Sequence, residues 1–171
     1  MKVVLQTMAF AAGMLAALPA SAQPAPACTT EPSNYGTQTH RCSGGVTIVA
    51  ESGARYTLLD RDRNGVVDAV GLRGKAVLVD APPQRKGTRF EVITPQAIAA
   101  VRGTKWAVDV AEPRTSVFVV GGSVGVRRRA GPGRVVLGPG EGVDVDPGSA
   151  PLTVRRWPQP RVDALLSRLG Q

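Results

Sequence analysis

Residues 60–71 carry oxygen-bearing side chains at the spacing of a calcium-binding loop. Four of them fall at relative positions 1, 3, 5 and 9 of such a loop: Asp60, Asp62, Asn64 and Asp68. Gly65 stands where the loop turns sharply, but Gly71 occupies position 12, where a bidentate Glu belongs. Because Arg61 and Arg63 also offset the negative charge, two interpretations stay open: a weak calcium site, or an Asn-Gly hairpin turn flanked by solvated charges.

A second group of charged side chains is the run Arg127, Arg128 and Arg129, which precedes Ala-Gly-Pro-Gly at 130–133, a hairpin-tip sequence. A run of this kind is usually a solvated loop. Its functional alternative is contact with an anionic partner or with lipid head groups. We keep partner contact as the hypothesis to be tested for these three arginines.

Enzymatic chemistry has little support in this sequence. The chain contains one histidine, His40, and no serine or cysteine that a motif pairs with a base. Asp144 and Asp146 share one face of an expected strand, but Pro147-Gly148 follows directly, and the pair is more typical of a polar strand edge. The sequence therefore favours a protein that is not an enzyme.

The two cysteines, Cys28 and Cys42, lie in a segment rich in Thr, Ser, Gly and Asn. In an oxidising compartment they predict one disulfide, which would staple an N-terminal loop at residues 23–45 and stabilise the fold by about 3 kcal/mol. Two alternatives are a lipid-anchored Cys28, which lacks the usual upstream aliphatic residue, and metal binding by both thiols with His40, which lacks a fourth ligand.

The N-terminus predicts export from the cytoplasm. A positive start, an apolar run at 3–18 and a small-x-small exit are typical of a secretory signal peptide, here residues 1–22 with cleavage after Ala22. The alternative, an uncleaved anchor, is short for a hydrocarbon core of ~30 Å. No later segment is apolar enough to span a membrane, so we expect a periplasmic or secreted chain with no transmembrane helix after cleavage.

The chain is basic, with a formal net charge of +8. Outside the cytoplasm the polyanions that a basic chain meets are lipid head groups, lipopolysaccharide and acidic glycans. The charge therefore indicates an anionic surface as a second kind of partner, and we expect no nucleic acid.

Short β-branched runs follow one another from residue 46 to residue 146, and Gly, Pro or charged residues separate them. This spacing is typical of a stack of short strands. Trp106, Val108 and Val110 alternate with polar or small residues, so one face of that strand is expected to lie on the core.

An ordered set of motifs lies within residues 90–147. It comprises Thr94-Pro95, Ala-Val-Arg-Gly-Thr at 100–104, Thr115, Gly-Ser-Val-Gly-Val at 122–126 and Leu-Gly-Pro-Gly-Glu-Gly at 137–142. In this order the motifs resemble the FecR domain, a module of the bacterial envelope. The resemblance implies an all-β extracytoplasmic domain, which in its best-known members relays a signal from an outer-membrane receptor to a cytoplasmic sigma factor. It marks as family motif residues Arg102, Gly103, Thr104, Thr115, Gly122, Gly140 and Glu141.

Arg102 has two interpretations. A guanidinium fork suits a carboxylate or phosphate, which would make this residue a recognition group. Alternatively, Arg102 pairs with a carboxylate at a strand end, and the candidates for that partner are Asp109, Glu112 and Glu141. In this second interpretation Gly103 adopts a backbone conformation that other residues avoid.

Residues 158–171 predict a helix. Pro160 suits its first position, Gly170 ends it, and an apolar stripe follows the helical period: Val162, Leu165, Leu166 and Leu169. We expect this stripe to pack on the open end or edge of the strand stack, with docking of a partner as the alternative.

Together these patterns predict one all-β domain at 46–157, solenoid-like or rolled, followed by the short helix, with a two-sheet β-sandwich as the alternative. The expected function is a non-enzymatic extracytoplasmic interaction or sensing module that binds an envelope protein. The alternative is a module that binds calcium or an anionic glycan. Calcium is the only cofactor under consideration.

Overall fold

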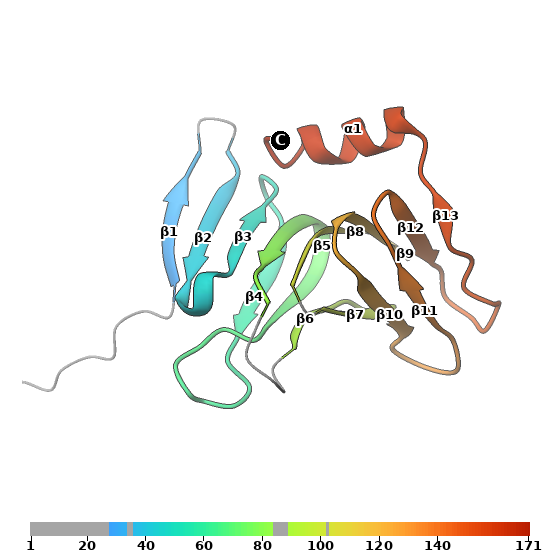
Figure 1. The fold of residues 1–171 in the computed structure, drawn as a ribbon, viewed down its shortest axis with the longest axis horizontal. Coiled ribbons are helices and arrows are strands. Elements are labelled where there is room, and N and C mark those ends of the chain that lie inside the picture. Colours follow the sequence, from blue (N-terminus) through green and yellow to red (C-terminus); the bar gives the residue numbers. More distant parts are fainter. Residues whose placement is uncertain (1–27, 34–35, 84–88, 102) are drawn as a thin grey trace, which may run out of the picture.

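The computed structural model describes residues 28–33, 36–83, 89–101 and 103–171, so the predicted signal peptide at 1–22 lies outside the described residues. The described chain folds into strands and one helix (Figure 1). In chain order the elements are β1 (Cys28–Pro32), β2 (Gln38–Cys42), the 3-10 turn η1 (Ser43–Gly45), β3 (Thr47–Ala50), β4 (Arg55–Leu59), β5 (Ala69–Ala81), β6 (Phe90–Ile93), β7 (Ala97–Val101), β8 (Thr104–Ala111), β9 (Arg114–Gly121), β10 (Val124–Arg128), β11 (Arg134–Leu137), β12 (Glu141–Val145), β13 (Arg155–Arg156) and α1 (Gln159–Ser167). Within these ranges no helix has the length and hydrophobicity needed to span a bilayer.

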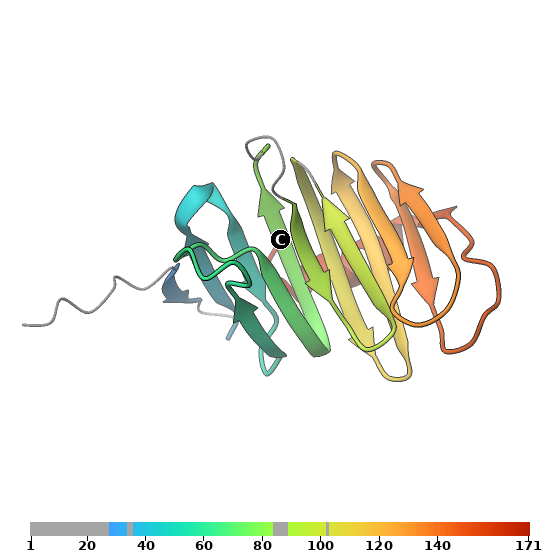
Figure 2. The same cartoon turned by 90° about the horizontal axis from the view of Figure 1, so that it is seen from below.

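The described strands belong to one sheet, and β5 joins its two halves. The first part of β5, residues 69–74, pairs with β4, and its residues 69–71 also pair in parallel with β6. The second part, residues 75–81, pairs with β8, and its residues 77–80 also pair with β3. The sheet curls so that the two halves face each other, and Figure 2 shows the strands side by side. The all-β prediction with a C-terminal helix is confirmed.

The curl is centred on Lys75, where β5 passes from one half to the other. Its φ of 62° lies in the left-handed region, which non-glycine residues seldom adopt. The Lys75 ammonium donates a hydrogen bond of 2.5 Å to the carbonyl oxygen of Ser52. This contact ties the bend in β5 to the turn between β3 and β4.

The main core fills the space between the two halves. Its largest fully buried side chains come from both of them: Trp106, Ile48, Leu72, Val70, Val92, Val117 and Val119. The predicted alternation in β8 is confirmed, because Trp106, Val108 and Val110 all lie in this core.

The helix α1 covers the outer face of one half (Figure 1). Val162, Leu165 and Leu169 are buried against four residues of the sheet and one of the preceding turn: Ala76, Leu78, Ala107, Phe118 and Trp157. The helix therefore packs on a face of the sheet. Our expectation that it would pack on an end or edge of the strand stack was wrong. The side chains of Ala76 and Ala107 are small, which lets the helix approach the sheet closely.

We call the half under α1 the covered half; it comprises β1, β2, β3, β8, β9, β12, β13 and residues 75–81 of β5. The remaining strands form the open half: β4, β6, β7, β10, β11 and residues 69–74 of β5. No described element packs on the outer face of the open half.

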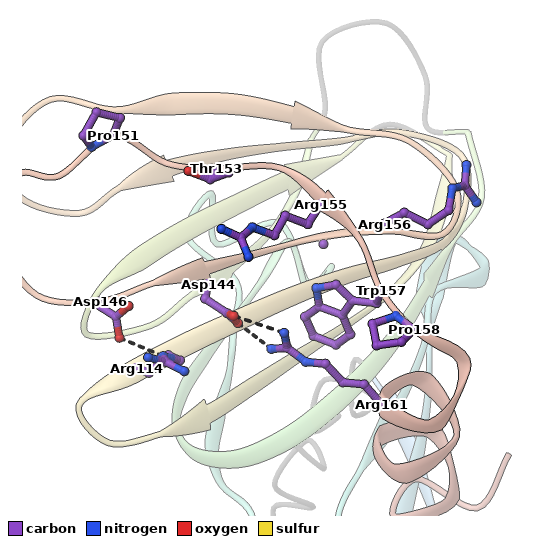
Figure 3. A pocket seen from close by; sticks show the side chains of 11 residues that line it. Arg114, Asp144, Asp146, Pro151, Thr153, Arg155, Arg156, Trp157, Pro158 and Arg161 are labelled. Atoms are coloured by element: carbon purple, nitrogen blue, oxygen red, sulfur yellow. Dashed lines mark hydrogen bonds and ion pairs between the residues drawn. The ribbon is translucent and has the colours of Figure 1, made fainter.

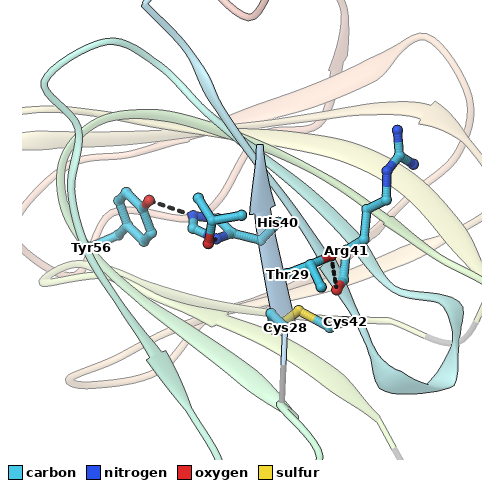
Figure 4. The surroundings of a disulfide bond; sticks show 7 residues. Cys28, Thr29, His40, Arg41, Cys42 and Tyr56 are labelled. Atoms are coloured by element: carbon cyan, nitrogen blue, oxygen red, sulfur yellow. Dashed lines mark hydrogen bonds between the residues drawn. A yellow bond between two sulfur atoms is a disulfide. The ribbon is translucent and has the colours of Figure 1, made fainter. Parts of the chain in front are cut away.

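The N-terminal segment differs from the loop that we expected at 23–45. β1 and β2 form an antiparallel hairpin, and β2 continues the ladder to β3. Cys28 and Cys42 lie opposite each other in this hairpin and form the predicted disulfide (Figure 4). The disulfide therefore joins the first described strand, β1, to β2 within the covered half.

Candidate functional site

Three of the family motif residues meet where the β7–β8 and β9–β10 connections lie side by side. Gly103 and Gly122 have φ angles of 71° and 90°, which favour glycine, and a Cβ on Gly122 would lie 2.6 Å from the Gly103 carbonyl oxygen. The Thr104 hydroxyl donates to the Ser123 carbonyl (2.9 Å) and accepts from the Ser123 N–H (3.2 Å). These residues hold the two connections together.

Thr115 joins the two halves of the sheet. Its side chain is fully buried at the start of β9, in the covered half. Its hydroxyl oxygen lies 2.9 Å from Thr94 Oγ1 and 2.7 Å from Gln96 Oε1, both in the β6–β7 turn of the open half. Thr94 in turn accepts a hydrogen bond from the Ala97 N–H (2.9 Å), which closes that turn.

Gly140 and Glu141 shape the turn before β12. The Glu141 carboxylate accepts a hydrogen bond of 2.7 Å from the Gly138 N–H within the same turn. Gly140 has a φ of 78°, and a Cβ there would lie 2.7 Å from a guanidinium nitrogen of Arg156. The described motif residues thus fix turns, and the structure does not bring them into one site.

The motif residue Arg102 lies outside the described residues. Its three expected partners make other contacts. Asp109 pairs with Arg168 (2.9 Å), Glu112 lies 3.5 Å from Arg55, and Glu141 accepts from its own turn.

The oxygen-bearing side chains of residues 60–68 serve different partners. Asp60 accepts from the backbone N–H groups of Asn64 (3.1 Å) and Gly65 (2.8 Å). Asp68 is buried and pairs with Arg61 at 3.2 Å. Across the described ranges, no three acidic, histidine or cysteine side chains converge in a way that would hold a metal ion.

Only part of the arginine run is exposed. Arg128 is buried, and its guanidinium donates to the carbonyl oxygens of Asp146 (2.6 Å) and Ala150 (2.5 Å). Arg128 therefore holds the chain after β12 in place by hydrogen bonds. Because its side chain is buried, it does not take part in the predicted partner contact. Arg127 and Arg129 remain exposed, and Arg129 also donates to the Thr94 carbonyl (3.3 Å).

The outer face of the open half carries two rows of cross-strand neighbours. One row consists of Thr57, Gly71, Ile93, Ile98, Arg127 and Arg134. The other consists of Leu59, Ala69, Glu91, Ala100, Gly125 and Val136. The small residues leave two shallow hollows of about 330 and 250 Å³, and Val136 is 63% exposed.

A cleft of about 560 Å³ lies on the outer face of the covered half, beside the start of α1 (Figure 3). Pro151, Thr153 and Arg155 form one wall, while Asp144 and Asp146 lie across from them. The four basic residues that line it are Arg114, Arg155, Arg156 and Arg161. The guanidinium groups of Arg114, Arg155 and Arg161 lie against two carboxylates and give the cleft a positive charge.

Ion pairs hold two of these arginines in place. Arg161 donates to Asp144 at 2.5 and 3.1 Å and lies 3.5 Å over the ring of Trp157, a cation-π contact. Arg114 donates to Asp146 at 2.7 Å. Burial alone would raise the pKa of Asp144, but hydrogen bonds from Arg161 and Ser116 outweigh it and hold this pKa below its ordinary value.

The Arg155 side chain has no hydrogen-bond or ion-pair partner within the described chain, although its backbone pairs with Gly142. Its side chain points into the space above Asp144, whereas that of Arg156 points away over the rim (Figure 3). Sequence patterns did not single out Arg155, Trp157 or Arg161. The pairing of β13 with β12 places Arg155 close to Asp144, and the docking of α1 on the sheet places Arg161 there. The sequence Arg-Arg-Trp before a predicted helix could have marked this region.

The strands and the single helix define an all-β domain. The FecR protein family matches residues 38–125, about half of the chain, and the chain therefore belongs to this family. The match starts earlier than the span 90–147 that carried the resemblance, and it does not reach Gly140 and Glu141.

Two crystal structures of a candidate anti-sigma factor from Parabacteroides distasonis ATCC 8503, at 1.65 and 2.50 Å resolution, share the fold. Each has a TM-score of 0.61 and 19% sequence identity, and each match covers 81% of this chain. The match covers 64% of the other protein's chain, so this chain corresponds to part of that protein. No curated protein is significantly similar in sequence.

Proposed function

We propose that this chain is a non-enzymatic, extracytoplasmic interaction and sensing module, and that it binds an envelope protein through the outer face of the open half. The observation that carries the proposal is the contrast between the two outer faces. Helix α1 covers one of them, whereas no described helix or strand covers the other, which presents apolar and small residues in cross-strand rows. Ala69 in one of these rows is nonetheless buried.

Charge on the uncovered face supports a protein partner with acidic groups. Four exposed arginines lie on or beside this face, and none has an ion-pair partner in the described chain: Arg73, Arg89, Arg127 and Arg134. The acidic residue of the face, Glu91, already pairs with Arg61 at 2.7 Å. An apolar centre with arginines around it is typical of protein interfaces.

The family of the chain and its disulfide also support a regulatory binding role outside the cytoplasm. The chain belongs to the FecR family, and the protein that shares its fold is a candidate anti-sigma factor, which is a regulatory class. A disulfide is typical of proteins outside the cytoplasm. These observations support a regulatory binding role and a location in the periplasm or beyond.

Site-specific photocrosslinking in the native envelope tests the proposal. A benzoylphenylalanine at Val136 is expected to give one discrete adduct with an envelope protein, because this side chain stands exposed on the face. The same probe at Ser167, exposed on α1, serves as the matched control. Arg127→Glu with Arg134→Glu should abolish the Val136 adduct, and an adduct that persists in this variant would refute the proposed face.

A further inference from the structure

We propose that the cleft beside α1 is a separate binding site for an extended, acidic peptide segment. The site lies on the covered half, away from the face discussed above, so it does not depend on the proposed function. Its volume of about 560 Å³ falls within the range of ligand-binding pockets.

The wall of the cleft suits an extended chain. Pro151, Thr153 and Arg155 alternate along it, while Leu152 and Val154 between them pack against the core. This alternation is that of a strand, and a stretch of five residues spans about 13 Å at a rise of 3.3 Å per residue. A peptide of a few residues could therefore lie along the wall with its side chains next to Arg155.

Arg155 supplies the unused charge. Its guanidinium has no partner in the described chain, and it points into the cleft (Figure 3). Arg114, on the opposite side of Asp144, donates to Asp146 through Nε and has no other side-chain partner described. A guanidinium fork binds a carboxylate through two parallel hydrogen bonds, so these two arginines fit the carboxylates of Glu or Asp side chains.

The aromatic group of the cleft argues for a peptide and against a glycan. Sugars commonly bind on an exposed aromatic face, but both faces of Trp157 are occupied. Phe118 stacks on one, with ring centroids 5.1 Å apart, and Arg161 lies over the ring at 3.5 Å. The ring is also buried, so its role is to hold Arg161 and the wall in place.

Fluorescence anisotropy with labelled octapeptides tests this site on the chain from residue 23 to residue 171. A peptide of alternating Glu and Val is expected to bind, and the same peptide with Gln in place of Glu is not. Arg155→Gln should weaken binding at least about tenfold, because a hydrogen bond to a charged group is lost. Arg63→Gln, the same change at an exposed arginine in the loop between β4 and β5 and outside both proposed binding surfaces, should leave binding unaltered. Unchanged melting temperatures of both variants would establish that they fold.

Three outcomes would overturn the proposal: equal binding of the Gln peptide, binding that Arg155→Gln does not weaken, or no binding of the Glu peptide. An oligogalacturonate that bound more tightly than the Glu peptide, and that lost its binding in Arg155→Gln, would reassign the cleft to an acidic glycan. Hydrogen exchange supplies an independent readout, since the Glu peptide should protect the amides of residues 152–155.

Discussion

A single carboxylate, Asp60, holds the loop between β4 and β5 through two backbone N–H groups. Asp60→Ala is expected to lower the free energy of unfolding by about 1 kcal/mol, because these hydrogen bonds are lost. Asp62→Ala is the matched control, since the exposed Asp62 side chain makes no hydrogen bond or ion pair within the described chain. Urea unfolding of both variants measures the difference. A rise in melting temperature with calcium that either substitution abolishes would instead show a calcium site.

His40 gives the stability of the fold a pH dependence. The ring is buried, with Nδ1 2.9 Å from Thr30 Oγ1 and Nε2 2.5 Å from Tyr56 Oη (Figure 4). Burial lowers the pKa of His40 below 6.5 in the folded chain, so the unfolded chain binds the proton more readily. The contribution of His40 is therefore complete above pH 6.5 and is lost as the pH falls through that value toward the lower folded pKa.

Melting temperatures of the native chain and of His40→Gln between about pH 8 and about pH 5 test this prediction. The native chain should lose stability across this window, and the variant should lose less. The carboxylates with lowered pKa, Glu51 and Asp144, do not interfere, because their contribution is lost only below their ordinary values of 4.5 and 3.8. Parallel pH profiles for the two proteins would contradict the prediction.

Single residues differ in how far the sequence reveals their role. The turn glycines were predictable, because Gly103 and Gly122 follow from local backbone needs. The burial of Arg128 was not, since its carbonyl partners, Asp146 and Ala150, lie about twenty residues further along the chain. The cleft was missed for the same reason: Asp144 looked like a polar strand edge until α1 placed Arg161 against it.

At the scale of elements, α1 depends on its apolar contacts with the covered half. Leu165→Ala is expected to lower the free energy of unfolding by about 2–4 kcal/mol, because Leu165 is buried against the sheet. Leu166→Ala, one position along and only partly buried, should cost about 1 kcal/mol or less. Thermal or urea unfolding measures both. Equal losses would contradict the seating of the helix seen in the structure.

Charged contacts fix the C-terminal end of the same helix. Arg168 donates to Asp109 at 2.9 Å and to Glu51 at 2.6 Å. Both hydrogen bonds raise the pKa of Arg168, and the bond to Asp109 contributes most. Burial alone would raise the pKa of Glu51, but the contacts with Arg168 and the Ala76 N–H bring it below its ordinary value. The ion pairs of Arg168, together with the Arg161–Asp144 pair, fix the position of α1 on the sheet.

Periodicity predicted the elements better than it predicted their neighbours. The alternation in β8 and the stripe of α1 follow directly from side-chain spacing. The hairpin β1–β2 could not be predicted from side-chain spacing, because Thr, Ser and Gly are common in loops. Its strands depend on the disulfide and on pairing with β3. The apolar stripe of α1 also does not indicate which surface the helix covers, since that surface depends on the small residues Ala76 and Ala107.

At the scale of the whole molecule, β5 couples the two cores. Val77 and Val79 point into the main core between the halves, whereas Ala76 and Leu78 lie under α1. Tryptophan fluorescence can follow each core separately, because Trp106 lies in the main core and Trp157 lies in the core under α1. Since one strand contributes to both, loss of either core should disturb the other.

Urea unfolding of two single-tryptophan variants tests this coupling. Trp157→Phe leaves Trp106 as the reporter of the main core, and Trp106→Phe leaves Trp157 as the reporter under α1. For each variant we expect the fluorescence midpoint to coincide with its own midpoint by circular dichroism, as a two-state domain requires. In the Trp106→Phe variant, a fluorescence midpoint clearly below the dichroism midpoint would show that α1 leaves the sheet before the fold is lost. The helix would then be a separable lid, and the cleft beside it would open with it.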